Sequence, residues 1–295
     1  MSRLADPKIL MSIKDLALSA RTTVDGFMAG IHAGTLKGEG MEFSQYRSYQ
    51  PGDDLRRLDW KMFARSDRYY IRESEIETSI SVRLLIDASA SMDHSDNGTT
   101  KIEYARYLAA SLAYLANLQH DAIGLYVFRD NGVFMLPSKN DSQHLSRIFY
   151  QLENIMPHGK FTEPVRYRDI FAGSSKKELL LFITDFYETE GEITQLLQAL
   201  SASRHEIIVF HLMARNEMEL DYSGYTALED LETSQVIPLN SNMHREAYAA
   251  EMEKHLLRIR KELLQRNISY RMIRTDEPVD KALTDFLQQR NKITR

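Results

Sequence analysis

Two short polar segments of the sequence carry residue types that suit the binding of a hard metal cation. Asp87, Ser89 and Ser91 form an Asp-x-Ser-x-Ser pattern, and Asp185 follows a second apolar run. Together they offer carboxylate and hydroxyl oxygens, without nitrogen or sulfur donors. Such a donor set suits Mg²⁺, which keeps several of its waters and tolerates an incomplete protein cage. The simpler interpretation is an Asx turn with a helix N-cap, which Asp and Ser also favour.

Each polar segment directly follows an apolar run that predicts a buried strand. Residues 82–87 (VRLLID) and 178–184 (ELLLFIT) are short and apolar, which is typical of parallel strands buried on both faces. In sheets of this kind, ligands bind at the carboxyl ends of the strands. We therefore expect Asp87 and Asp185 to meet at one edge of the sheet.

The rest of the chain after residue 80 alternates predicted helices with predicted strands. Helices are expected at 101–117, started by a Thr100–Glu103 capping box, at 142–154, from a Thr189–Glu192 cap to 202, at 244–266 and from Pro278 to 290. Strands are expected at 122–128 and 132–136, joined as a hairpin, and at 206–212 and 268–273. Residues 214–243 look irregular, with one possible short strand at 236–239.

This alternation predicts an α/β fold with a mostly parallel six-stranded sheet, helices on both faces and an antiparallel hairpin at one edge. Residues 82–87 form its central strand, and residues 80–295 form the domain. Residues 1–79 are rich in turn residues and poor in apolar runs. We expect this N-terminal segment to pack on the sheet, because its apolar content is too low for a core of its own.

Composition excludes several classes of protein. The 295 residues carry a net charge of −5 and no cysteine, which excludes disulfides, thiolate metal sites and cysteine nucleophiles. Residues 42–75 hold seven Lys/Arg and seven Asp/Glu, so their arginines are interpreted as paired within the segment. We therefore expect no nucleic-acid partner. No apolar run is long enough to span a bilayer and no signal peptide is evident, so we expect no membrane insertion and a cytoplasmic location.

A longer pattern upstream of Asp87 resembles a known family. It comprises Gly38-x-Gly40-x-x-Phe43, Arg47-x-Tyr49, Pro51-Gly52-Asp53-Asp54, Arg56, Leu58-Asp59-Trp60, Ala64-Arg65 and Arg72-Glu73, with Leu231-Glu232-Thr233 and Phe286-Leu287-x-x-Arg290 further on. The block is similar to the bacterial domain-of-unknown-function family fifty-eight, over about residues 26–290. Asp87-x-Ser89-x-Ser91 resembles the metal-ion-dependent adhesion site (MIDAS) of von Willebrand factor A-like domains.

The resemblance implies a role for each site residue. Ser89 and Ser91 would ligate Mg²⁺ (or Mn²⁺ or Ca²⁺) directly, while Asp87 would act largely through water and hold the serines. Thr162 would be a further ligand from a later loop, and Asp185 would complete the site through water. One coordination position would stay open for a carboxylate from a partner. Members of the family often accompany MoxR-type AAA+ ATPases, so such an ATPase or its client is the implied partner.

An enzymatic interpretation stays open beside this one: a Mg²⁺-dependent hydrolase or phosphoesterase that uses Asp87 and Asp185. The motifs expected of several enzyme classes are missing. Ser89 stands where an Asp-x-Asp phosphotransferase needs a second aspartate, and the sequence has no P-loop, G-x-S-x-G or H-E-x-x-H. Only Asp93 and His94 lie near the first loop as candidate bases. We favour the non-catalytic interaction module.

Overall fold

A computed structural model of the chain describes residues 15–35, 45–49, 60–73, 79–161, 177–202, 205–220 and 225–294. The chain divides into two compact units. The main unit comprises residues up to Phe27 together with Ser79–Arg295, and the second unit is Met28–Thr78. Thr162 lies outside the described residues.

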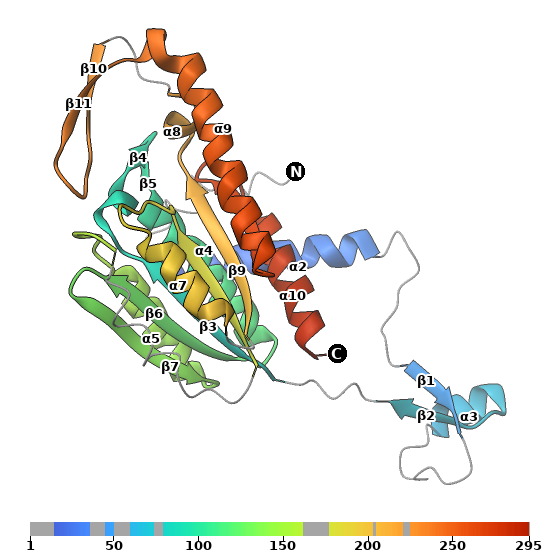
Figure 1. Cartoon of the computed structure of the whole chain (residues 1–295). Helices are drawn as coiled ribbons and strands as arrows, with labels where there is room; N and C mark the ends of the chain where they lie inside the picture. Colours follow the sequence, from blue (N-terminus) through green and yellow to red (C-terminus); the bar gives the residue numbers. More distant parts are fainter. Residues whose placement is uncertain are drawn as a thin grey trace. The chain divides into compact units, whose positions relative to one another are not determined.

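Six strands of the main unit form one sheet. They are β3 (Ser81–Asp87), β6 (Ala122–Arg129), β7 (Gly132–Lys139), β8 (Glu178–Thr184), β9 (Glu206–Met213) and β12 (Ser269–Arg274). Their order across the sheet is β12, β9, β8, β3, β6, β7. Figure 1 labels four of these strands, β9, β3, β6 and β7. All neighbours are parallel except β6 and β7, which pair as an antiparallel edge hairpin. The predicted six-stranded, mostly parallel sheet with an interior 82–87 strand is confirmed.

Burial explains why these strands could be predicted from the sequence. All seven residues of β8 are buried, and β3 and β9 are buried over most of their length. A strand covered by helices on both faces needs an unbroken apolar run. The edge strand β7 instead alternates between half-buried and exposed residues toward its end, as a strand with one open face does.

Helices cover both faces of the sheet. They are α4 (Lys101–Leu118), α5 (Ser142–Glu153), α7 (Glu192–Ser201), α9 (Ser241–Gln265) and α10 (Asp280–Thr294). Residues of α7 and α9 share one apolar core with Leu85, Leu180 and Phe182 of the sheet. On the other face, α4 contacts β3, β6, β8 and β9, and it is flanked by α5 and α10. The prediction of helices on both faces is confirmed.

Two helix starts differ from the sequence-based expectation. The predicted Thr189–Glu192 cap was wrong, because α7 begins at Glu192 and its N-cap is Gly191 with φ 79°. Glycine adopts this left-handed conformation without the steric penalty of a side chain. The last helix, α10, begins at Asp280, two residues after Pro278. The Thr100–Glu103 capping box of α4 is present in full.

The interpretation of residues 214–243 as irregular was wrong. They contain α8 (Arg215–Glu219) and a hairpin of β10 (Tyr225–Glu229) with β11 (Val236–Asn240). Only β11 was anticipated, as a possible strand at 236–239. These elements are short, and among the described strands β10 and β11 pair only with each other. Their residues therefore lack the long apolar runs that mark the main sheet.

The N-terminal residues fall into both units. In the main unit, α2 (Leu16–Thr35) buries Ala20 and Val24, and the Thr23 hydroxyl lies 2.5 Å from that of Tyr107 on α4. The second unit contains α3 (Trp60–Ser66) and the antiparallel pair β1 (Gln45–Ser48) and β2 (Tyr70–Glu73). That residues 28–79 pack on the sheet stays a prediction.

Candidate metal site at the carboxyl ends of β3 and β8

The register of the sheet brings the two predicted aspartates to the same edge. β3 and β8 are parallel neighbours with Ile86 opposite Ile183. Asp87 ends β3, Asp185 directly follows β8, and both side chains are buried. Two residues 98 positions apart in the sequence therefore meet at the carboxyl edge of the sheet.

Hydrogen bonds join four of the five predicted site residues in one chain. Asp87 Oδ1 accepts bonds from the Ser89 amide at 2.9 Å and the Ser89 hydroxyl at 2.7 Å. The Ser89 and Ser91 hydroxyl oxygens are 3.0 Å apart, and Ser91 donates to Asp185 Oδ1 at 3.2 Å. The oxygens of Asp87, Ser89, Ser91 and Asp185 thus lie together, as a site for a hard cation requires.

The same contacts separate the two interpretations of the Asp-x-Ser-x-Ser segment. The bond from the Ser89 amide to Asp87 is an Asx turn, as the simpler interpretation expects. The N-cap part of that interpretation holds for the position of Ser89 but not for its side chain. Ser89 precedes the short 3₁₀ helix η3 (Ala90–Asp93), but its side chain makes no capping bond. Its hydroxyl faces Asp87 and Ser91 instead.

Backbone contacts hold this loop in place. The Ala88 amide donates to Phe128 O at 3.0 Å and the Ala90 amide to Gly159 O at 2.8 Å. The bond to Gly159 holds the loop after α5 beside the site. At the end of the described part of this loop, the Phe161 ring stacks on Phe128 with centroids 5.3 Å apart. Thr162, the fifth predicted residue, follows directly, and its position is not among those described.

Thr184 and Lys101 are site residues that the sequence reasoning missed. The Thr184 hydroxyl donates to Asp87 Oδ2 at 2.6 Å, so each carboxylate oxygen of Asp87 has a partner. Lys101, the buried first residue of α4, places Nζ 2.9 Å from Asp185 Oδ2 and 2.5 Å from Glu217 Oε1. Thr184 adjoins Asp185 and Lys101 follows the capping threonine, but neither position by itself indicates a contact with an aspartate of the site.

Burial and charge set the protonation of these groups. Burial alone would lower the pKa of Lys101, but Asp185 and Glu217 raise it above its usual value. Burial alone would raise the pKa of Asp185, but the Lys101 ammonium outweighs burial and lowers that pKa below its usual value. Asp87 has no such partner, so burial and the charge of Asp185 raise its pKa to about 7. A second positive charge beside Asp87 would favour its ionised form.

The donor set fits a hard divalent cation. It consists of two serine hydroxyls and two carboxylates. Within the described part of the chain, no three or more His, Asp or Glu side chains form a metal site by themselves, so the serine hydroxyls would have to supply ligands. A cation held here would therefore keep several waters, which is the behaviour of Mg²⁺ in proteins. The residues that would hold it are Ser89, Ser91, Asp87 and Asp185.

A third carboxylate approaches the site from the β10–β11 hairpin. Burial, Asp87 and Asp185 raise the pKa of Glu232 to about 7, and the nearby Ser91 and Ser89 hydroxyls partly offset that rise. Its Oε1 atom is buried and makes no well-formed hydrogen bond within the described chain. The Leu231-Glu232-Thr233 motif belongs to the family pattern, but the sequence reasoning gave Glu232 no role at the site.

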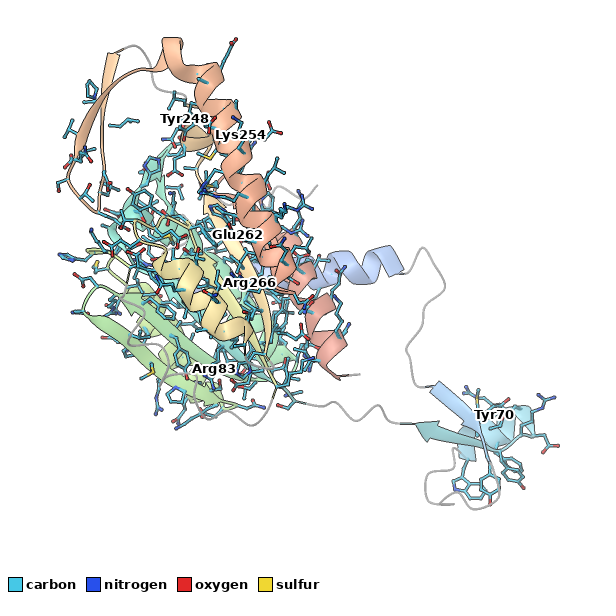
Figure 2. The ribbon with its side chains drawn as sticks, viewed as in Figure 1. Tyr70, Arg83, Tyr248, Lys254, Glu262 and Arg266 are labelled. Atoms are coloured by element: carbon cyan, nitrogen blue, oxygen red, sulfur yellow. The ribbon has the colours of Figure 1, made fainter. Side chains whose placement is uncertain are left out.

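A cavity of about 430 Å³ lies beside the metal site, under the hairpin. Polar lining comes from Ser91, Lys101 and Asp185, and apolar lining includes Leu228, Leu231 and Met252. Tyr248 also lines it and donates to Glu217 O at 2.6 Å. Figure 2 shows Tyr248 near the hairpin end of α9, and Arg83, at the start of β3, near the opposite end of the sheet.

His94 and Asp93 are the candidate bases of the enzymatic interpretation. His94 Nε2 lies 2.9 Å from Asn216 Oδ1, so that ring nitrogen donates its proton to an amide oxygen. Asp93 is exposed at the end of η3. Neither residue is hydrogen-bonded to the Asp87–Asp185 cluster in the described contacts.

A family model described as "Protein of unknown function DUF58" matches residues 45–258, which is well over half of the chain. The chain belongs to the DUF58 family. The matched range includes Asp87, Ser89, Ser91, Asp185 and Glu232. A relative from Mycobacterium tuberculosis, described as an uncharacterized protein, is 27% identical over 236 residues, covering 78% of this chain and 73% of its own length.

Solved structures of similar fold include BatB from Bacteroides thetaiotaomicron and the SpRpn10 VWA domain. BatB is 18% identical with a TM-score of 0.48, and the match covers 72% of this chain and all of BatB. The SpRpn10 domain is 12% identical with a TM-score of 0.40, over 72% of this chain and 95% of the domain.

None of the helices in the described ranges is long and apolar enough to cross a membrane.

Proposed function

We propose that this DUF58 protein is a non-catalytic, Mg²⁺-dependent protein-interaction module. Asp87, Ser89, Ser91 and Asp185 would hold the cation, Mg²⁺ or alternatively Mn²⁺ or Ca²⁺, with Thr162 as a further candidate ligand. One observation carries the proposal. The hydrogen-bonded series Asp87–Ser89–Ser91–Asp185 lines up four hard oxygen donors at the carboxyl ends of two adjacent parallel strands.

Each residue of the site has a distinct role in this function. Asp87 orients the Ser89 hydroxyl, and Thr184 holds Asp87. Lys101 binds Asp185 Oδ2, which leaves Oδ1 directed to Ser91. A cation bound mainly by hydroxyls keeps much of its positive charge and attracts a carboxylate. The site would therefore join this protein to an acidic side chain of a partner.

The partner and location rest on the family resemblance. We propose a MoxR-type AAA+ ATPase, or the client on which it acts, as the protein that supplies the carboxylate, in the cytoplasm. The net charge of −5 gives no support to a nucleic-acid partner. Assembly or maturation of other proteins is the process that this pairing suggests.

The enzymatic alternative has one observation in its favour. A buried carboxyl with a pKa of about 7, as for Asp87, is matched to proton transfer near neutral pH. Metal-dependent hydrolysis of a phosphoester by the purified protein, abolished in Asp185→Ala, would replace the interaction module with a hydrolase.

Metal binding is tested with a double substitution, Ser89→Ala with Ser91→Ala. We expect Mg²⁺ at one hundred times its Kd to stabilise the wild-type protein by about 2.7 kcal/mol in urea unfolding. The double variant should lose this stabilisation. The matched control is Ser201→Ala with Ser269→Ala, since Ser201 ends α7 and Ser269 starts β12, away from the site. Undiminished Mg²⁺ binding by the Ser89/Ser91 variant would refute the assignment.

Partner binding is tested by retrieving complexes from cells of the source organism with and without EDTA. We expect EDTA, Asp87→Ala and Asp185→Ala each to abolish the complex with the MoxR-type ATPase or its client. A complex that is indifferent to EDTA would refute the metal-mediated contact.

A further inference from the structure

The tip of the β10–β11 hairpin is a rigid turn that fixes Glu232 in space. Asp230 Oδ1 accepts bonds from the amides of Glu232 at 2.8 Å and Thr233 at 3.1 Å. The Asp230 amide donates to Gln235 O at 2.9 Å, and the Ser234 amide donates to Asp230 O at 2.7 Å. These four hydrogen bonds hold the backbone from which the Glu232 side chain extends.

The same turn is tied to the candidate metal site. The Tyr187 hydroxyl donates to Asp230 Oδ2 at 2.5 Å, and the Tyr187 amide donates to Asp185 Oδ1 at 3.2 Å. A single residue therefore links the hairpin tip to the loop after β8. This link brings the Glu232 carboxyl next to Ser89 and Ser91.

The surroundings of Glu232 lack a positive charge to balance it. Asp87 and Asp185 are the charged groups that act most strongly on it. Lys101 is engaged with Asp185 and Glu217, and the described ion pairs include none to Glu232. A buried carboxylate oxygen without a partner is costly, so buried charges in proteins are normally paired or coordinate metals. Oε1 of Glu232 is buried without a hydrogen-bond partner in the described chain, and the carboxyl group lies near the Ser89 and Ser91 hydroxyls that are assigned to the cation.

We propose that Glu232 is a ligand of the cation from within the chain, and that its carboxylate occupies the coordination position that a partner's acidic side chain must take. This inference rests on the proposed function of the Asp87–Ser91–Asp185 site. It makes the β10–β11 hairpin an internal competitor: the partner binds only when the hairpin withdraws Glu232.

The structure of the hairpin is consistent with withdrawal. β10 and β11 pair only with each other in the described chain, and a two-stranded ribbon is marginally stable by itself. The cavity of about 430 Å³ beneath it leaves part of its inner face unpacked. The hydrogen bond from Tyr187 to Asp230 attaches the tip beside the site.

The experiment compares Glu232→Gln with Glu229→Gln in the full-length protein, with Mn²⁺ as the probe. Glu229 lies on the same hairpin with an exposed side chain, so both changes remove the same charge. We expect Glu232→Gln to weaken Mn²⁺ binding about tenfold by calorimetry, the scale seen when a residue supporting a metal is lost. Water-proton relaxation should show about one additional Mn²⁺-bound water, the expected replacement for a lost ligand. Glu229→Gln should match the wild type in both measurements.

Two further measurements separate ligation from charge. Glu232→Asp keeps the charge but shortens the reach, so a ligand role predicts the Gln phenotype and a charge effect predicts the wild-type one. Added acetate, as the probe for a partner's carboxylate, should displace Mn²⁺-bound water more readily in Glu232→Gln than in the wild type.

The outcomes distinguish the two proposals. Equal Mn²⁺ affinity and hydration in wild type, Glu232→Gln and Glu229→Gln would overturn the internal ligand and leave the cation site standing. Absence of Mn²⁺ binding by the wild-type protein would overturn both.

Discussion

At the scale of single residues, Lys101 determines the charge of the candidate site. It is almost completely buried, and its ammonium group bonds to Asp185 and Glu217. Without it, the buried Asp185 would face Asp87 with no positive charge to compensate either carboxylate. Lys101 also fixes which oxygen of Asp185 points to Ser91, so it acts as a positioning residue of the site.

We expect Lys101→Met to lower the free energy of unfolding by about 3–5 kcal/mol, because removing one partner of a buried ion pair leaves the other charge buried. Urea unfolding in EDTA measures this without interference from metal. The control is Lys254→Met on α9 (Figure 2), whose ion pair with Glu251 is exposed and should cost less than about 1 kcal/mol. A loss for Lys101→Met as small as that of the control would show that Lys101 does not neutralise Asp185.

At the scale of elements, the start of α4 positions Lys101. The Thr100 hydroxyl accepts from the Glu103 amide at 3.2 Å, and the Glu103 carboxylate accepts from the Thr100 amide at 2.8 Å. Thr100, the N-cap residue of this capping box, stands one residue before Lys101. The helix therefore begins where its first side chain can reach Asp185 across the carboxyl edge of the sheet.

We expect Thr100→Ala to lower the free energy of unfolding by about 1 kcal/mol, the usual cost of losing an N-cap. Thr284→Ala in α10 is the control: its hydroxyl donates to Asp280 O inside a helix, an interaction that adds little to stability. Urea unfolding of both variants measures the difference. Equal effects from the two substitutions would contradict a capping role for Thr100.

At the scale of the whole molecule, residues before Phe27 are part of the main unit. Val24 and Ala20 of α2 are completely buried. The Thr23 and Tyr107 hydroxyl oxygens are 2.5 Å apart. The Arg21 guanidinium carbon lies 5.9 Å from the centroid of the Tyr114 ring on α4. The described residues of the second unit make the end of α2, one two-stranded sheet and the short helix α3. The N-terminal residues thus depend on the main unit for burial.

We expect a fragment of residues 1–78 not to unfold cooperatively, since the buried residues of α2 would lose their partners. A fragment of residues 79–295 should fold, with a free energy of unfolding about 2–4 kcal/mol below that of the full chain, from the lost burial of Val24 and its neighbours. A fragment of residues 28–295 should show the same decrease in the free energy of unfolding relative to the full chain. Full stability of residues 28–295 would show that α2 contributes nothing to the main unit.

Local patterns in the sequence were sufficient for most of the elements. The buried strand at 178–184, the capping box at Thr100 and the edge hairpin all depend on residues close together in the chain, so apolar runs and cap residues revealed them. The meeting of Asp87 and Asp185 followed from one rule about parallel strands. Thr189 is not the N-cap of α7, because Gly191 adopts a left-handed conformation and the helix begins after it, at Glu192.

Other features were decided only by the tertiary structure. Glu232 lies 145 residues after Asp87, in a segment without apolar periodicity, and it reaches the site because a short hairpin is tied through Asp230 to Tyr187. Lys101 resembles any lysine in the first turn of a helix until the sheet places Asp185 opposite it. Residue types and local order are properties of the sequence, whereas the charge and the third carboxylate at this site result from long-range packing that no local pattern records.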